Sequence, residues 1–273
     1  MKIISIILLS IFSVLNFQTE NYYIIKIKGE IYNETSGKSL KQGDAIKAED
    51  KLKFTQKNAV ALVISDTRGR FILKYPERVE ESVDALTVFV KNALVANVQN
   101  RLSTRSVATQ SAINHLDNYL GRDEFNIIGD ELIVMLSEKS YSISRGNDII
   151  ARYYLNNRKY GKELSMKNQT MVLSRSKFEL PVSEEVCLEK VDIYKINASV
   201  GEENLITTID LRFIVKDELE KEFMTIIEKF NNGQTSNSKI RSLLLNYFME
   251  FYGKTDDFYL NQYVTQLIND NVN

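Results

Sequence analysis

The stretch YYIIKIKGEIYNETSGKSLKQGDAIKAEDKLKFTQKNAVALVISDTRGRFIL, residues 22–73, decides the fold that the sequence predicts. Residues 23–32 alternate apolar and polar side chains, residues 59–65 form a continuous apolar run, and residues 70–73 return after a turn. Alternation with period two and short β-branched runs are typical of strands. We count about five short strands here, and their spacing predicts a small antiparallel barrel or sandwich.

Turn residues separate these predicted strands. Gly37 and Gly43 lie in polar clusters, Asp44 follows the second of them, and Gly69 lies at the tip of a predicted hairpin. Glycine adopts the positive φ angles that tight turns need, and aspartate accepts hydrogen bonds from nearby backbone N–H groups. We therefore expect all four to be structural turn residues.

The order of these motifs resembles the FecR-type β domain of bacterial envelope proteins. A strand that ends at a glycine is followed by a Leu-x-x-Gly-Asp-x-Ile turn and then by a strand that ends in a glycine hairpin. The matching positions are Gly29, Leu40, Gly43, Asp44, Ile46, Ala59 and Gly69. The resemblance implies this β fold for residues 20–97 and an envelope setting. We expect no counterpart of the cytoplasmic anti-sigma segment of the best-known members, so their regulatory function is not implied.

The N-terminal residues 1–19 predict an export signal. Lys2 precedes a largely apolar run over residues 3–17, and polar sequence follows. This run is shorter than the about 20 residues that a membrane-spanning helix needs, whereas it fits the apolar core of a secretory signal peptide. We expect cleavage near residues 18–20, which leaves no integral membrane span and places the protein in the periplasm or outside the cell. Retention of the segment as a membrane anchor is the alternative.

The remainder of the chain predicts a second β unit and a helical end. Residues 98–122 are interpreted as a linker that contains a helix over residues 106–120, ended by Gly121. Residues 123–216 continue in short apolar strands, which predicts a second antiparallel sandwich. Residues 217–273 change to helical period. The expected fold class is α+β, mainly β, with two small antiparallel sandwich or barrel units followed by C-terminal helices.

Composition argues against several functions. The 35 basic and 36 acidic residues nearly balance, which gives no overall positive field for a nucleic acid partner. His115 and Cys187 are the single histidine and cysteine, so a zinc site or a Cys–His nucleophile has few residues to use. We expect no cofactor, no metal site and no catalytic residues, and we interpret Cys187 as a packed thiol. Acidic pairs such as residues 123–124 and 256–257 keep a carboxylate-dependent hydrolase as an alternative.

The tip of the predicted hairpin is one candidate binding site. Asp66, Arg68 and Arg70 surround Gly69 there. Two guanidinium groups at such a tip are suited to hold a carboxylate or phosphate through paired hydrogen bonds. A turn that only improves solubility is the alternative.

Aromatic residues on the last two predicted helices are the other candidate. They recur at helical spacing and are Tyr247, Phe248, Phe251 and Tyr263. Such a stripe docks a partner or a second copy, or it packs on the protein's own β core. The sequence therefore favours a non-catalytic exported envelope protein that acts as a protein-binding or scaffold module. The alternatives are a membrane-tethered sensor or accessory protein and a carboxylate-dependent cell-wall hydrolase.

Overall fold

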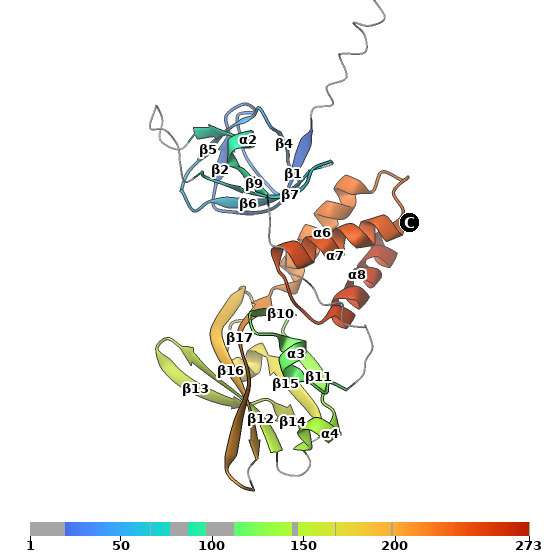
Figure 1. The fold of residues 1–273 in the computed structure, drawn as a ribbon. Coiled ribbons are helices and arrows are strands. Elements are labelled where there is room, and N and C mark those ends of the chain that lie inside the picture. Colours follow the sequence, from blue (N-terminus) through green and yellow to red (C-terminus); the bar gives the residue numbers. More distant parts are fainter. Residues whose placement is uncertain are drawn as a thin grey trace, which may run out of the picture. The chain divides into compact units, whose positions relative to one another are not determined.

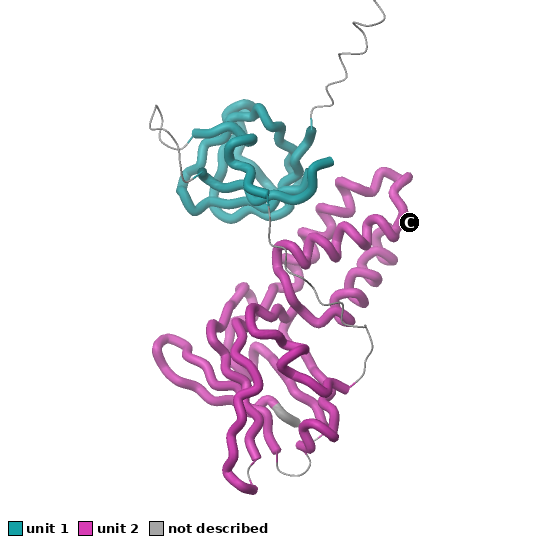
Figure 2. The backbone as a smooth tube through the Cα atoms, in the orientation of Figure 1, with its two compact units in different colours: residues 1–98 teal, residues 99–273 magenta. Residues whose placement is uncertain are grey.

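The structure is a computed structural model in which the chain forms two compact units, residues 1–98 and residues 99–273 (Figures 1 and 2). It describes residues 20–65, 67–76, 87–96, 112–143, 147–166, 168–197 and 199–272. The predicted signal peptide lies outside the described residues. The described chain is mainly β, with several antiparallel sheets and a C-terminal helical segment, and this confirms the predicted fold class.

Unit 1 contains two small antiparallel sheets around one apolar core. The first, of order β4-β1-β6-β7-β9, consists of β1 (Asn21–Lys28), β4 (Ala45–Lys47), β6 (Val60–Ser65), β7 (Gly69–Lys74) and β9 (Leu94–Ala96). The second, of order β3-β2-β5-β8, consists of β2 (Ile31–Asn33), β3 (Lys38–Ser39), β5 (Lys51–Phe54) and β8 (Thr87–Phe89). Buried side chains from both sheets, among them Ile24, Leu52, Phe54 and Val63, share the core.

The single strand predicted over residues 23–32 is in fact two strands, which Gly29 separates. Gly29 has a φ of +80°, and a Cβ atom there would lie 2.9 Å from the Cβ atom of Ala59. A β-bulge after Ile24 also interrupts the alternation, so that Ile24 and Ile25 are both buried. Glycine tolerates this φ angle and leaves room for Ala59, which allows the chain to pass from the first sheet to the second here.

The apolar and β-branched run at residues 86–95 predicts a last strand of unit 1, but the structure divides this run between the two sheets. It forms β8, the short helix α2 (Val90–Ala93) and β9. Strand β8 pairs with β5, and β9 pairs with β7. The helical turn therefore carries the chain between sheets, which an apolar pattern alone does not reveal.

Unit 2 is built on a five-stranded sheet of order β10-β17-β16-β12-β13. Its strands are β10 (Glu124–Ile128), β12 (Asn147–Leu155), β13 (Arg158–Glu163), β16 (Val186–Asn197) and β17 (Glu202–Ile214). A smaller sheet contains β11 (Glu131–Met135), β14 (Ser165–Met166) and β15 (Thr170–Ser174), and the short helices are α3 (Leu116–Leu120), α4 (Glu138–Tyr141) and α5 (Arg175–Phe178). One hydrophobic core joins the inner faces of both sheets.

Two details of unit 2 differ from the prediction. Strand β10 pairs with β17 in parallel, whereas an entirely antiparallel sandwich was expected. Alternation places side chains on faces but does not encode the direction of the neighbouring strand. The helix expected over residues 106–120 is described from residue 112 onward, and only α3 is helical there. Gly121 ends α3 with a φ of +83°, as predicted.

The chain ends in three helices, α6 (Lys216–Phe230), α7 (Asn237–Phe251) and α8 (Asp257–Asn271). Ser236 and Asp256 cap the starts of α7 and α8, because their side chains accept backbone hydrogen bonds of 3.3 Å and 2.6 Å. The sequence of residues 217–220 fits a capping box and predicts a helix start at Asp217. This prediction is wrong, since α6 begins earlier, with Val215 as its N-cap residue. Within the described residues, no helix combines the length and the apolar character needed to cross a membrane.

Candidate functional site

The predicted binding hairpin of unit 1 is tied to a carboxylate at the start of the described chain. Glu20 accepts hydrogen bonds from the hydroxyl groups of Tyr22 (2.9 Å), Thr67 (2.9 Å) and Ser65, and its carboxylate lies 2.8 Å from Nε of Arg68. Burial raises the pKa of the Glu20 carboxyl, but these hydrogen bonds and the arginine charge outweigh it and hold the pKa below its ordinary value. One of the two arginines expected to bind an anion therefore already has a carboxylate partner.

The other two predicted residues of that tip, Asp66 and Arg70, do not form an anion-binding site with Arg68 in the described structure. Asp66 lies outside the described residues. Arg70 is half-buried and takes part in interactions within the chain. The Arg68 side chain remains 70% exposed beside its ion pair with Glu20, so it is the one predicted tip residue that we find open to solvent in the described part of this hairpin.

The predicted turn residues connect the strands of unit 1. Gly37, Gly43 and Gly69 have φ angles of +70°, +87° and +96°. The carboxylate of Asp44 accepts a hydrogen bond of 2.8 Å from the N–H group of Lys41, which closes the loop before β4. These four residues shape the unit and have no placement that suggests a ligand.

We expect Glu20 to make unit 1 sensitive to acid. A carboxyl whose pKa is lower in the folded chain stabilises the fold above its unfolded value of 4.5, and the contribution is lost as the pH falls through the folded pKa. The Glu20→Gln variant should therefore be less stable at neutral pH and should change less between neutral pH and about pH 3.

Hydrogen exchange in peptides from β6 and β7, corrected for its intrinsic pH dependence, measures this effect. The matched control is Glu49→Gln, which removes an exposed carboxyl of the same unit. Identical pH dependence in Glu20→Gln, Glu49→Gln and the unchanged chain would refute the role of Glu20.

The aromatic residues predicted on the last two helices form the interior of a bundle of α6, α7 and α8. Tyr247 and Phe248 are fully buried, Tyr263 is nearly so, and Phe251 is half-buried. The ring of Phe223 on α6 lies 6.2 Å from that of Tyr247 and 6.0 Å from that of Tyr263, measured between centroids. A partner reaches these side chains only if the bundle opens, because the helices cover one another.

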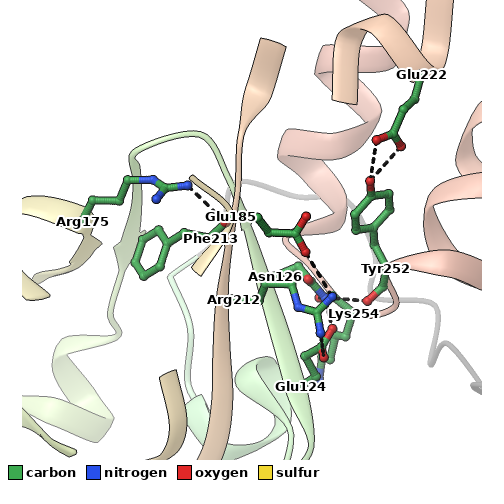
Figure 3. Close-up of polar contacts among 9 residues, drawn as sticks. All are labelled: Glu124, Asn126, Arg175, Glu185, Arg212, Phe213, Glu222, Tyr252 and Lys254. Atoms are coloured by element: carbon green, nitrogen blue, oxygen red, sulfur yellow. Dashed lines mark hydrogen bonds and ion pairs between the residues drawn. The ribbon is translucent and has the colours of Figure 1, made fainter. Parts of the chain in front are cut away.

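A buried glutamate lies in this interior. Glu222 of α6 is 2% exposed and accepts hydrogen bonds from the hydroxyl groups of Tyr247 (2.8 Å) and Tyr252 (2.7 Å). Figure 3 shows the contact with Tyr252. Burial, together with the charge of Glu222, raises the pKa of both tyrosines, so both stay protonated and act as donors. The carboxylate thereby links α6 to α7 and to the residue that follows α7.

The Tyr247→Phe variant should lose about 1.5 kcal/mol of stability in the bundle, because one of the two tyrosine donors to a buried carboxylate disappears. Hydrogen exchange in peptides from α6 and α7 checks this. Tyr259→Phe is the matched control, since Tyr259 is a half-buried tyrosine at the start of α8, where its backbone N–H donates to Asp256. Equal losses in the two variants would show that the contact with Glu222 contributes nothing.

The segment between α7 and α8 anchors the bundle to the edge of the five-stranded sheet. Asn126 on β10 donates from its N–H group to the carbonyl of Lys254 (2.8 Å) and from Nδ2 to the carbonyl of Tyr252 (2.7 Å) (Figure 3). Thr255 returns a hydrogen bond of 2.7 Å from Oγ1 to the carbonyl of Asn126. Sequence reasoning missed this junction, and the only signal for it is a polar residue inside an apolar strand.

The junction occupies one end of the outer face of the sheet, the face turned away from the core. Arg212 on β17 lies there between Glu124 (2.8 Å) and Glu185 (3.3 Å), as Figure 3 shows. Ile128 and Ile214 are also buried at this end. The rest of the outer face extends over β17, β16, β12 and β13.

A cluster of large side chains lies on that remaining outer face. The odd positions 149–153 of β12 are buried in the core, so its even positions face outward. Paired residues share a face, and the register places Tyr194 of β16 beside both Ile150 and Leu205. We define the outer patch as Ile150, Arg152, Tyr154, Tyr194, Glu203 and Leu205.

An ion pair fixes the centre of the outer patch. Arg152 donates from both terminal nitrogens to the two carboxylate oxygens of Glu203 (2.8 Å and 2.6 Å), and its guanidinium carbon lies 4.7 Å from the ring centroid of Tyr194. Their hydrogen bond raises the pKa of Arg152 and lowers that of Glu203, so both groups stay charged and paired. Tyr154 is 63% exposed and Leu205 is 55% exposed. The outer patch thus presents aromatic and aliphatic surface around a neutralised pair.

The residues considered for catalysis have other placements. Within the described ranges, no three His, Cys, Asp or Glu side chains are grouped so that they could hold a metal ion. Cys187, predicted to be packed, is exposed, because the pleat of β16 turns it away from the buried Leu188. His115 is the N-cap residue of α3, while Glu124 takes part in an ion pair and Asp256 caps a helix.

Comparison with known proteins found no relative of this chain. No family model matches the chain, and no curated protein or solved structure matches it. The FecR-type resemblance of residues 20–97 therefore stays a prediction, and function has to be argued from the geometry of the described residues.

Proposed function

We propose that this protein is an exported protein of the bacterial envelope that works as a binding or scaffold module, and that the outer patch is its contact surface. The observation that carries the proposal is that exposed Tyr154 and Leu205 share one face of the sheet with Tyr194. Of the two surfaces expected from sequence, the hairpin has its exposed Arg68 already paired with Glu20, and the helical aromatic residues are mostly buried within the bundle.

The chemistry of the outer patch favours protein contact. Single exposed apolar side chains are common on soluble proteins, whereas a contiguous group marks an interaction surface. Tyrosine and arginine are enriched at interfaces because they bury large areas and keep a polar group for hydrogen bonding. Arg152 already has its charge matched by Glu203, so covering this pair leaves no unpaired charge.

Export through residues 1–19 and a FecR-type fold for residues 20–97 are parts of the same proposal. The carboxylate of Glu20 is built into unit 1, so cleavage immediately before it preserves the described fold. N-terminal sequencing of the mature protein tests this. A start at residues 18–20 supports export with removal of the signal, and a retained Met1 supports the membrane-tethered alternative.

Recovery of partners from envelope fractions tests the contact surface. The purified chain, Tyr154→Ala and the control Tyr32→Ala are used as baits, because Tyr32 is an exposed tyrosine of unit 1. We expect Tyr154→Ala to lose the recovered protein and Tyr32→Ala to keep it. The same recovery with all three baits would exclude the outer patch as the contact surface.

A further inference from the structure

We infer that Asn232 is the site of a self-modification, in which the backbone nitrogen of Gly233 attacks the side-chain amide and the asparagine becomes aspartate or isoaspartate. The site lies in the loop between α6 and α7, residues 231–236. The reaction uses only this loop and water, so the inference is independent of the outer patch and of its partner.

The loop contains the one Asn-Gly pair of the sequence. Such a pair favours a turn, and the glycine places no side chain beside the nitrogen that has to react. Gly233 has a φ of +75°, and no described atom outside its chain neighbours lies within 4 Å of the position of its missing Cβ. Asn232 and Gly233 are both exposed, so water and hydroxide reach the two reacting groups.

Hydrogen bonds fold the side chain of Asn232 back over residue 233. Its Oδ1 atom accepts from the N–H group of Gln234 (3.1 Å) and from the hydroxyl group of Thr235 (2.9 Å). An asparagine whose Oδ1 accepts from the N–H group two residues ahead closes a turn with its own side chain. The amide carbon of Asn232 and the nitrogen of Gly233 therefore belong to the same closed turn.

The attacking nitrogen is held weakly. The N–H group of Gly233 donates to Oδ1 of Asn231 at 3.4 Å, which is longer than an ordinary hydrogen bond. Little interaction is therefore lost when hydroxide removes this proton and makes the nitrogen a nucleophile.

The reaction closes a five-membered ring and then opens it with water. The deprotonated nitrogen of Gly233 forms a bond to Cγ of Asn232, the bond from Cγ to Nδ2 breaks, and the amide group leaves as ammonia after taking a proton from water. Water then opens the cyclic imide at either of its carbonyl carbons, which gives aspartate or isoaspartate. The sum is one ammonia lost and one water gained, and nothing is oxidised or reduced.

The two donors to Oδ1 also favour the chemical step. Attack at Cγ places negative charge on Oδ1 of Asn232, and the groups of Gln234 and Thr235 already donate to this atom. Donors that are in place where negative charge develops stabilise the transition state. We therefore expect the folded loop to react faster than the same residues in the unfolded chain.

The product places a negative charge beside the C-terminus of α6. Asn231 is the C-cap residue of that helix, and its N–H group donates to the carbonyl of Ile227 (2.8 Å). The carbonyl end of a helix carries partial negative charge, so a carboxylate beside it is unfavourable. Isoaspartate also adds one carbon to the backbone of the loop. Conversion should therefore speed hydrogen exchange in the last turn of α6.

Mass spectrometry of the folded full-length chain, incubated at several pH values, tests the inference. A protease that cuts after Lys229 and Lys239 releases residues 230–239. The mass of this fragment should rise by the exchange of one NH2 group for OH, fragmentation should place the change at position 232, and the rate should increase with pH. Asn232→Gln should stop the reaction, because a longer side chain would need a less favourable ring. Asn237→Gln is the matched control and should leave the rate unchanged.

Thr235→Val separates the contribution of the folded loop from that of the dipeptide alone. It removes the hydroxyl donor to Oδ1 and should slow conversion of the folded chain about threefold, the effect expected for one hydrogen bond. The same variant unfolded in urea should react as fast as the unchanged chain in urea. Circular dichroism confirms that each variant is folded without urea.

Three results would overturn the inference. They are a fragment whose mass does not change in the folded chain, a change that fragmentation places at Asn231 or Asn237, and conversion that is no faster in the folded chain than in urea. An unchanged rate in folded Thr235→Val would equally reject the role of the loop.

Discussion

Replacement of Arg175 by alanine should lower the free energy of unfolding of unit 2 by about 3–5 kcal/mol. Arg175 is 1% exposed, and its guanidinium group donates to the carbonyl groups of Pro181 (2.6 Å), Glu184 (2.8 Å) and Phe213 (3.0 Å). Figure 3 shows the contact with Phe213. Without the side chain these carbonyl groups lose a charged donor, and a buried acceptor without a partner is costly.

The position of Arg175 explains why so much depends on one side chain. It begins α5 directly after β15, and its contacts reach the segment before β16 and the strand β17. Burial lowers its pKa, yet an arginine keeps its charge at neutral pH. Arg175→Lys should recover only part of the loss, because an ammonium group lacks the planar fork that serves several carbonyl groups at once.

Hydrogen exchange in peptides from β15 and β17 measures the loss in unit 2 separately from unit 1, which a single unfolding curve does not. The control is Arg241→Ala on α7, an exposed arginine with one hydrogen bond of 2.8 Å to Asn261. It should cost less than about 1 kcal/mol. If Arg175→Ala costs no more than this control, the carbonyl contacts are not what holds this part of unit 2 together.

Gly29→Ala should destabilise unit 1 by about 2–4 kcal/mol, because it combines backbone strain with a steric clash. The φ angle of +80° is unfavourable for alanine, and the new Cβ atom would lie 2.9 Å from the Cβ atom of Ala59 and 3.1 Å from its Cα atom. Ala59 is 1% exposed, so it has little room to move.

Gly69→Ala separates the two causes. Gly69 has a φ of +96° in the same unit, but no atom lies within 4 Å of the position of its missing Cβ. This control should cost about 1–2 kcal/mol from backbone strain alone. Combining Gly29→Ala with Ala59→Gly should recover part of the excess, since the double variant removes one of the clashing atoms. Equal costs for Gly29→Ala and Gly69→Ala in hydrogen exchange of unit 1 would contradict the close approach.

The strands and helices were predictable wherever one pattern continued over a whole element. The stripe at Leu244, Tyr247 and Phe248 predicted a helix with a buried face, but a stripe does not say what covers it. Here the cover is the neighbouring helices and the buried Glu222, whose own burial has no local signal. The predicted bounds of the strands were wrong where tertiary contacts decide them, as at Gly29, which divides one predicted strand into two.

The outer patch was beyond sequence reasoning for a related reason. Tyr153 and Tyr154 are neighbours of the same type, yet the first is buried and the second is exposed. Only the register of β12 against β16 decides which of the two faces the core. The turn after β12 does have a local sequence signal, because Asn156 and Asn157 both have positive φ angles and asparagine tolerates them.

Photo-crosslinking in expressing bacterial cells tests most directly whether the outer patch is the contact surface. A photoreactive amino acid replaces Tyr154 in one chain and, as a control, Tyr32 in another, because both tyrosines are exposed. The account predicts a crosslinked species of higher mass than the chain from position 154 and none from position 32. No crosslink from position 154 above that from position 32 would contradict it.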